Sequence, residues 1–265
     1  MAASQYRGQK LVEQYGDSLD VEVWKERLKS YAPSTQQHYL YSVHDYLKSL
    51  GKDTEAIYKE SMKMKASLHE EAKQQTKNTK QEANWLPWKD VLRVREELAK
   101  TQSNYSRHLR YLIVCLYTMM PPLRLDWAEA VICESPALPE KGNVVDIVNK
   151  KFVLRNYKTV KRHGELRLDI PDELMAVIKK SLEDYPRKAL LGQRENHDEP
   201  MTSPTLSHTL KRTMTDVSGR EMNLQLLRRS YVSHQMEGQP SLLEQEKQAL
   251  ALGHTFAIHQ LYRKL

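Results

Sequence analysis

The sequence has no hydrophobic run long enough to cross a membrane, and it has only two cysteines. Its most apolar stretch, residues 111–120, falls short of the roughly 20 apolar residues that a membrane helix needs. Residues 1–10, MAASQYRGQK, lack the apolar core of a secretory signal peptide. Cys115 and Cys133 do not indicate a disulfide framework, and Cys115 is expected to be a small core residue. These absences predict an intracellular protein with no membrane partner.

Nucleotide and metal signatures are also missing. The sequence contains no Walker loop, and its ten histidines are scattered rather than spaced as metal ligands. It shows no internal repeat. We therefore expect no cofactor and no metal.

The charge balance is the first positive signal. Lysine and arginine number 41 against 34 aspartates and glutamates, which gives a net charge of +7. Such an excess suits a polyanionic partner, because lysine and arginine displace counterions from phosphates. The 265 residues, 40% of them hydrophobic and 28% charged, are typical of one large globular domain or two smaller ones.

The first part of the chain is predicted to be helical. Between residues 18 and 60 the apolar side chains recur at helical spacing, with Ser34 as a predicted N-cap and Gly51 as a predicted stop. Residues 72–82 carry no large apolar side chain, which is typical of an exposed connection. We predict a helical N-terminal domain over residues 1–75, a linker over 76–84 and a second domain over 85–265.

The second domain is predicted to be mostly helical around one small sheet. An amphipathic helix starts near Trp88, and residues 106–120 are apolar on most sides, as in a buried central helix. Three β-rich segments follow, with Gly164 in a tight connection, and they predict a small antiparallel sheet; these segments span 143–148, 151–156 and 165–170. Helices then return, one of them capped at Thr202 and another stopped at Gly253. The fold class is mainly α with a small antiparallel β-sheet.

Four segments carry the candidate chemistry. They are PPLRLDW (121–127), NYKTVKRHGELRLDI (156–170), LQLLRRSYVSH (224–234) and LGHTFAIHQLY (252–262). Each is weak alone, since a double arginine on a helix is usually an exposed face and a Gly-His pair is usually a helix stop. In order and spacing, however, the four together resemble the catalytic domain of the tyrosine recombinase (phage integrase) family. Residues 31–51, YAPSTQQHYLYSVHDYLKSLG, are similar to that family's core-binding domain.

The resemblance implies a set of catalytic residues, which are Arg124, Lys158, Gln225, Arg228, His254 and Tyr262. Arg124 and Arg228 would clamp two phosphate oxygens, as planar guanidinium groups do well. Tyr262 would attack phosphorus and form a 3′-phosphotyrosine. Lys158 would protonate the leaving oxygen, and His254 would donate a hydrogen bond to the phosphate or orient the tyrosine. The covalent bond stores the energy of the cut ester, so that rejoining needs neither ATP nor metal.

The sequence departs from the family pattern at three places. Gln225 stands where the family usually has histidine, and glutamine cannot act as an acid or base. Trp127 stands where an acidic residue often follows the first arginine, and Asp126 is one position earlier. Lys161 and Arg162 compete with Lys158 for the role of hairpin cation. We expect altered activity rather than its loss.

The implied partner is double-stranded DNA, bound by a homo-oligomer that works as a tetramer on two duplexes. Basic residues expected on the DNA backbone are Lys161, Arg162, Lys211 and Arg212. The sequence PPLR loosely resembles versions in eukaryotic mobile elements and large DNA viruses, which favours a site-specific recombinase or integrase. Two alternatives stay open: a type IB topoisomerase-like or telomere-resolving enzyme, and a DNA-binding relative that has lost catalysis.

Overall fold

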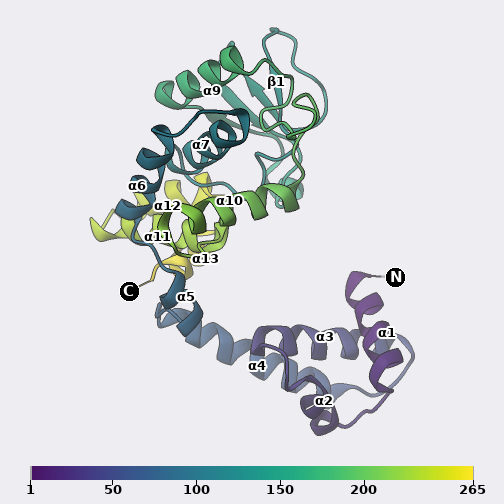
Figure 1. Ribbon diagram of the computed structural model, residues 1–265. Coiled ribbons are helices and arrows are strands. Elements are labelled where there is room, and N and C mark those ends of the chain that lie inside the picture. The colour runs from purple at the N-terminus through teal and green to yellow at the C-terminus, as the bar shows by residue number, and fades with distance from the viewer. Residues whose placement is uncertain (1, 265) are drawn as a thin grey trace. The chain divides into compact units, whose positions relative to one another are not determined.

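The chain forms two compact units, each with its own hydrophobic core. The computed structural model describes residues 2–264, apart from the side chain of Arg162. Unit 1 comprises Met1–Thr76 and unit 2 comprises Lys77–Leu265. Both are built mainly of helices, as the sequence predicts (Figure 1).

Unit 1 consists of helices packed around α3. Its elements are α1 (Ala3–Tyr15), α2 (Val21–Leu28), α3 (Pro33–Ser49) and α4 (Glu55–Lys73). Helix α3 packs against both α1 and α4. Gly8 permits the close approach of α1, because a Cβ at this position would lie 2.0 Å from the Ser42 carbonyl oxygen. The core between the helices is formed by Trp24, Leu28, Leu40, Val43, Leu47 and Ile57.

The ends of α3 test two sequence predictions. Gly51, with φ +77°, follows the end of the helix, so the predicted stop is confirmed. The predicted N-cap at Ser34 is wrong, because the helix begins at Pro33 with Ala32 as its N-cap. Proline suits the first helical position, where its missing N–H would have no partner within the helix.

Unit 2 is a helical unit with one sheet. Its helices are α5 (Thr79–Asn84), α6 (Trp88–Ala99), α7 (Tyr105–Thr118), α8 (Val160–His163), α9 (Asp172–Asp184), α10 (Ser203–Ser218), α11 (Leu224–Glu237), α12 (Leu242–Ala251) and α13 (Phe256–Tyr262). The predicted central helix is confirmed: α7 is buried along most of its length and packs against α6, α9 and α10. Cys115 on α7 is fully buried, as predicted, and both thiols are free.

The sheet has four strands in the order β1-β2-β3-β4, which are β1 (Val131–Cys133), β2 (Val144–Asp146), β3 (Lys151–Leu154) and β4 (Leu166–Asp169). The three predicted strands, β2 to β4, pair antiparallel as expected. The first strand, β1, adds a parallel pair to β2, so the sheet is mixed rather than purely antiparallel. A loop of ten residues between β1 and β2 allows the chain to return to the same end of the sheet.

The segment predicted as a linker contains a short ordered helix. Helix α5 begins after Asn78, whose side chain accepts a hydrogen bond from the Gln81 N–H. Asn84 then accepts a hydrogen bond of 2.9 Å from the N–H of Glu221, in the loop between α10 and α11. The bond to Glu221 holds this segment, which has no large apolar side chain, against the loop between α10 and α11.

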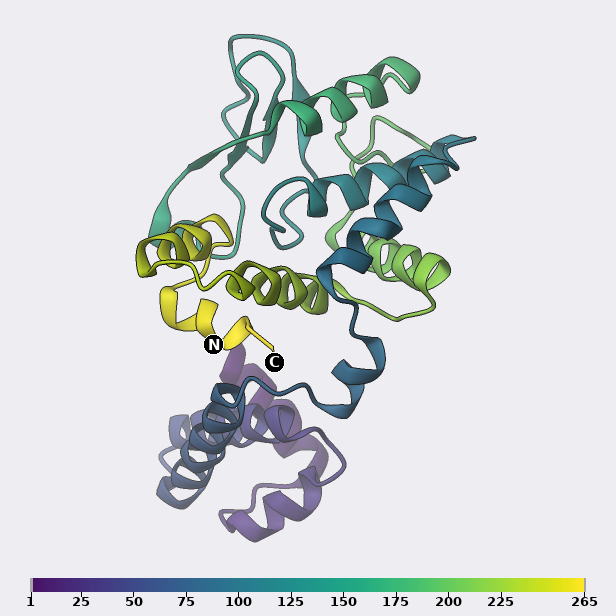
Figure 2. The ribbon, with the colours of Figure 1, turned by 90° about the vertical axis from the view of Figure 1, so that its left-hand side faces the viewer.

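The segments that carry the candidate chemistry lie next to one another in unit 2. Helix α13 packs against both α11 and α12, and α11 packs against α6 (Figure 2). The turn after α7 holds Arg124, and the turn after β3 holds Lys158. Within residues 2–264, no helix combines the length and apolar character needed to span a membrane.

Candidate active site

Arg228 on α11 lies at the centre of the candidate site. Its side chain is only 2% exposed. Nη1 donates a hydrogen bond of 3.0 Å to the carbonyl of Pro122, and Nη2 donates one of 2.9 Å to the carbonyl of Leu252. Burial lowers the pKa of the Arg228 guanidinium, but arginine starts so high that it keeps its charge. Arg228 therefore ties the loop before Arg124 to the end of α12.

His254 accepts the next contact of the same guanidinium. Its Nε2 lies 2.5 Å from Nη2 of Arg228. Because arginine can only donate, Nε2 must be the unprotonated nitrogen and Nδ1 must carry the proton. Burial, reinforced by the charges of Arg228 and Arg124, lowers the pKa of His254 to about 3. The imidazole is therefore neutral at neutral pH, and its buried Nδ1 has no partner in the part of the chain that the structure describes.

Arg124 is held by its backbone and reaches the same turn. Its carbonyl accepts a hydrogen bond of 2.7 Å from the Tyr117 hydroxyl, and its N–H donates one of 3.0 Å to Oδ2 of Asp126. Its Nη2 donates to the carbonyl of Gly253 over 3.3 Å. Gly253 has φ +63°, and a Cβ there would lie 3.3 Å from Nη1 of Arg124. Both this backbone conformation and the close approach of Arg124 favour glycine here.

Tyr262, the last residue of α13, lies beside these groups. Its half-buried ring is 4.3 Å from the His254 ring, centre to centre. The guanidinium groups of Arg228 and Arg229 each lie 5.8 Å from the centre of the Tyr262 ring, within the range of cation–π attraction. Thr255 caps α13 by accepting a hydrogen bond from the Ile258 N–H. The cap and the packing on α11 and α12 place the tyrosine next to the two arginines.

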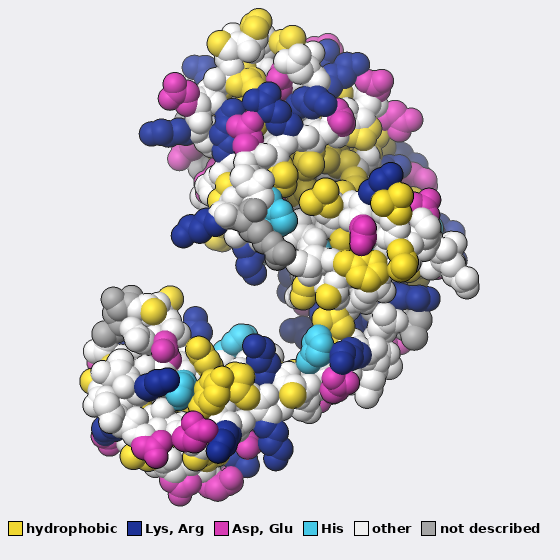
Figure 3. All heavy atoms as spheres, turned by 180° about the vertical axis from the view of Figure 1, so that it is seen from behind, with side chains coloured by type: hydrophobic (Ala, Val, Ile, Leu, Met, Phe, Trp, Pro, Cys, Tyr) yellow, Lys and Arg dark blue, Asp and Glu magenta, His cyan; other side chains and the backbone are white. Residues whose placement is uncertain are grey.

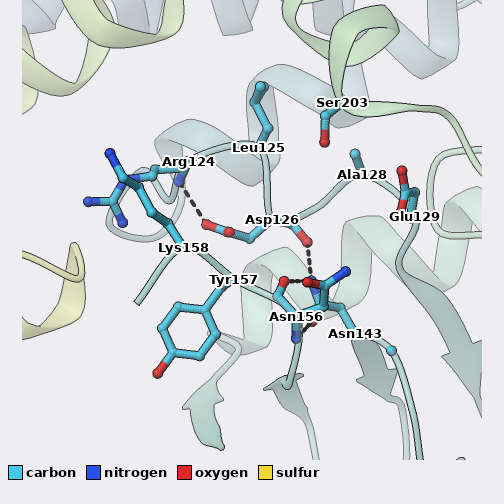
Figure 4. Close-up of a pocket in the computed structure, with 11 residues that line it drawn as sticks. Arg124, Leu125, Asp126, Ala128, Glu129, Asn143, Asn156, Tyr157, Lys158 and Ser203 are labelled. Atoms are coloured by element: carbon cyan, nitrogen blue, oxygen red, sulfur yellow. Dashed lines mark hydrogen bonds between the residues drawn. The ribbon is translucent and has the colours of Figure 1, made fainter. Parts of the chain in front are cut away.

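Lys158 approaches Arg124 from the sheet. It is exposed and follows β3 by four residues. Figure 4 shows its side chain beside that of Arg124 at the edge of a cavity of about 470 Å³. The cavity is also lined by Leu125, Asp126, Ala128, Glu129, Gly142, Asn143, Asn156, Tyr157 and Ser203. Burial raises the pKa of Asp126, and the hydrogen bond from Arg124 together with the charges of Arg124 and Arg228 opposes that rise.

The structure places Gln225 apart from this cavity. It is exposed in the first turn of α11 and lines a second cavity, of about 220 Å³, with Asn84, Asn223 and Arg229. Of the predicted catalytic residues, Arg124, Arg228, His254 and Tyr262 are thus connected by contacts, and Lys158 shares a cavity with Arg124. Among the described contacts, none joins Gln225 to these five.

The predicted DNA contacts lie on two elements. Lys161 is exposed on α8, whereas the side chain of Arg162 lies outside the described part of the structure. On α10, Lys211 forms an ion pair of 2.8 Å with Glu221, and Arg212 lies 3.7 Å from Asp216. Figure 3 shows lysine and arginine interspersed with aspartate and glutamate over the visible face of unit 2.

Two site residues were missed by the sequence prediction. Arg229 lies over the Tyr262 ring, although a double arginine usually marks an exposed helix face; here Arg228 is buried and Arg229 half-buried. Asn143 is 6% exposed and hydrogen-bonds the segments that carry Arg124 and Lys158. An isolated asparagine before a strand has no signature in the sequence. Within residues 2–264, no three histidine, cysteine or acidic side chains are grouped as metal ligands.

Comparisons with known proteins give a likeness of structure without a likeness of sequence. No family model and no curated protein matches the sequence. Thirteen chains of solved structures match the fold. One of them, described as the crystal structure of XerA recombinase, aligns with a TM-score of 0.51 at 12% sequence identity. The alignment covers 99% of this chain and 85% of that one.

At this identity the likeness establishes the fold. The chain has a mainly helical fold with a small mixed sheet, similar to the fold of the chain described as XerA recombinase.

Proposed function

We propose that the protein is a tyrosine-type enzyme that cuts and rejoins DNA strands, with Tyr262 as its nucleophile. One observation carries the proposal: Tyr262 lies 4.3 Å from the ring of His254, and His254 is hydrogen-bonded to Arg228. The guanidinium of Arg124 reaches the adjacent turn at Gly253. Three distant segments thus bring two arginines, a histidine and a tyrosine together, as phosphoryl transfer to a tyrosine requires.

The two arginines supply the phosphate site. Attack on a phosphodiester builds negative charge on its non-bridging oxygens, and guanidinium groups bind such oxygens in pairs. Arg124 and Arg228 are positioned by hydrogen bonds to backbone carbonyls before any DNA enters. Donors that are fixed in advance stabilise a transition state without the cost of reorganising.

The covalent step needs only groups of the chain. The Tyr262 hydroxyl loses its proton to solvent, and its oxygen attacks phosphorus and forms a 3′-phosphotyrosine as the bond from phosphorus to the 5′-oxygen breaks. Lys158 donates a proton to the leaving 5′-oxygen, which becomes a free hydroxyl. Rejoining is the reverse: the 5′-hydroxyl attacks the phosphotyrosine, and Lys158 takes the proton back.

His254 acts as a neutral hydrogen-bond donor. Its Nε2 accepts from Arg228, so its Nδ1–H is left to donate to a bound phosphate or to orient Tyr262. The negative charge of a bound phosphodiester beside the imidazole would raise the pKa of His254 from its low value.

The substrate is proposed to be double-stranded DNA, and the reaction site-specific recombination or integration by a tetramer on two duplexes. The recombinase-like fold over 99% of the chain supports this class. The similarity of residues 31–51 to a core-binding domain supports a DNA-binding role for unit 1. Lys161, Lys211 and Arg212 are proposed backbone contacts. The PPLR sequence supports a mobile element or a virus as the source.

The proposal is tested by covalent trapping on nicked duplex DNA of randomised sequence. The wild type is expected to form a protein–DNA adduct that resists denaturant, and Tyr262→Phe is expected to form none. Sequencing the trapped DNA would identify the target site. Salt-sensitive DNA binding without any adduct would contradict the proposal and favour a catalytically silent relative, for which Gln225→His is the first reversion to try.

A further inference from the structure

Asn143 uses its whole side chain for hydrogen bonding at the edge of the candidate site. It directly precedes β2 and is 6% exposed. Its Nδ2 donates to the carbonyls of Asp126 and Asn156, both over 2.9 Å. Its Oδ1 accepts from the N–H of Arg155 over 3.0 Å and from the N–H of Asn156 over 2.8 Å. Figure 4 shows the bonds to Asp126 and Asn156 as dashed lines. All four partners are backbone groups.

These bonds link the segments that carry Arg124 and Lys158. Asp126 is two residues after Arg124 and accepts the Arg124 N–H on its carboxylate. Asn156 is two residues before Lys158. The Asn143 carbonyl also accepts the N–H of Val131, which joins β1 to the same point. One buried side chain therefore fixes the backbone before the lysine relative to the backbone after the arginine.

We propose that Asn143 is a positioning residue that sets Lys158 relative to the phosphate site at Arg124. The inference rests on the proposed function. A general acid must come within hydrogen-bond reach of the leaving oxygen, and Lys158 is exposed on a long side chain. The reach of its ammonium group therefore depends on where its backbone is held.

The primary amide of Asn143 matches the hydrogen-bonding groups around it. It offers two N–H donors and an oxygen with two lone pairs, which matches the two carbonyls and two N–H groups around Asn143. Aspartate keeps the shape and the acceptor but cannot donate to the two carbonyls. Alanine leaves all four backbone groups without this partner.

The test compares two leaving groups. Nicked duplexes are prepared with either the natural 5′-oxygen or a bridging 5′-sulfur at the target phosphodiester. A thiolate leaves without being protonated, so the sulfur substrate bypasses the general acid. Asn143→Ala is expected to cut the oxygen substrate about 100-fold more slowly than wild type, in the range that general acids contribute. It is expected to cut the sulfur substrate within about threefold of wild type, as Lys158→Ala should also do.

Three controls separate positioning from damage to the fold. Thermal unfolding checks that each variant is folded, and Asn143→Asp takes the place of Asn143→Ala if the alanine variant is not. Arg124→Ala is expected to stay slow on both substrates, because its defect is in binding the phosphate. The double variant Asn143→Ala/Lys158→Ala is expected to be no slower than Lys158→Ala, because both changes remove the same proton transfer.

The outcomes distinguish this inference from the proposed function. A folded Asn143 variant that is equally slow on both substrates, or as fast as wild type on oxygen, would overturn the role of Asn143 alone. Failure of the wild type to form an adduct with either substrate would overturn the proposed function and the inference with it. Rescue of both Asn143→Ala and Lys158→Ala by sulfur, with no rescue of Arg124→Ala, would support the inference.

Discussion

Arg228 holds His254 through a hydrogen bond of 2.5 Å between Nη2 and Nε2, and the same guanidinium lies 5.8 Å from the ring centre of Tyr262. The bond fixes the tautomer of the imidazole, because an arginine cannot accept. It also joins α11 to the turn between α12 and α13, so that the arrangement exists before DNA binds.

Replacing Arg228 by lysine should remove the hydrogen bonds that hold the site together, while keeping one positive charge. A lysine cannot donate to Pro122, Leu252 and His254 in the same fork geometry. We expect adduct formation to slow by about 100-fold or more, and the free energy of unfolding to fall by about 1–3 kcal/mol. Single-turnover trapping and urea unfolding measure the two effects. Arg93→Lys on the exposed face of α6 is the matched control and should change neither; an Arg228→Lys enzyme at wild-type rate would contradict the assignment.

A methyl group at Gly253 should disturb Arg124. Gly253→Ala and Gly219→Ala both place alanine at positive φ, +63° and +71°, and each should lose about 1–2 kcal/mol of stability. Only at Gly253 would the new Cβ lie 3.3 Å from Nη1 of Arg124; at Gly219 no atom lies within 4 Å. Cleavage should slow by roughly ten- to a hundredfold for Gly253→Ala alone. Equal cleavage rates for the two variants would argue against the contact between this turn and Arg124.

The free energy of unfolding of unit 2 should decrease as the pH is lowered from about 6.5 to about 3. In the folded state the pKa of His254 is lowered to about 3 by burial and by Arg228 and Arg124, while the unfolded chain binds the proton near pH 6.5. The unfolded state therefore binds more protons in this window, and stability is lost as the pH falls. Burial lowers the pKa of His259 in the same direction. Urea unfolding from pH 7.5 to pH 4 should show a smaller loss for His254→Gln than for wild type, and identical pH profiles would refute the prediction.

Exposed and paired lysines should contribute differently to DNA binding. Lys161 is exposed on α8, whereas Lys211 is partly neutralised by Glu221 at 2.8 Å. Lys161→Ala should reduce the slope of log affinity against log salt concentration by about 1, and Lys211→Ala should reduce it by less. Fluorescence anisotropy with duplex DNA from 50 to 300 mM salt measures both slopes, because the Debye length falls about 2.4-fold over this range. A larger change for Lys211→Ala would reverse the ranking of the two contacts.

Local sequence patterns predicted most of the helices, but they did not predict the elements that are held in place by contacts with residues distant in the sequence. The buried helix α7 and the amphipathic α6 followed from apolar spacing, and Thr202 caps α10 as expected. Strand β1 was missed because three residues are too few to show the alternation of a strand. It is held in the sheet by its pairing with β2. Helix α5 was predicted as linker because its hydrogen bonds to the loop after α10 leave no trace in composition.

For the candidate site, too, the sequence indicated some residues by their order but not the contacts that surround others. The order of motifs pointed to Arg124, Arg228, His254 and Tyr262, which contacts connect in the fold. The sequence could not show that Gln225 lines a different cavity together with Arg229, because motif spacing does not tell which side chains of a helix the surrounding loops cover. Asn143 was unpredictable for a similar reason: its four partners are backbone groups, which any residue can supply.

The most direct test of the central claim is to identify the amino acid that carries the DNA. The adduct trapped on a nicked duplex is digested with nuclease and protease, and the nucleotide-bearing peptide is sequenced by mass spectrometry. Tyr231→Phe, which changes the half-buried tyrosine that packs on Trp88, serves as the matched control and should leave the adduct intact. We expect a 3′-phosphate ester on Tyr262 in both wild type and Tyr231→Phe, and no adduct in Tyr262→Phe. An adduct on another residue, or one that persists in Tyr262→Phe, would contradict this expectation.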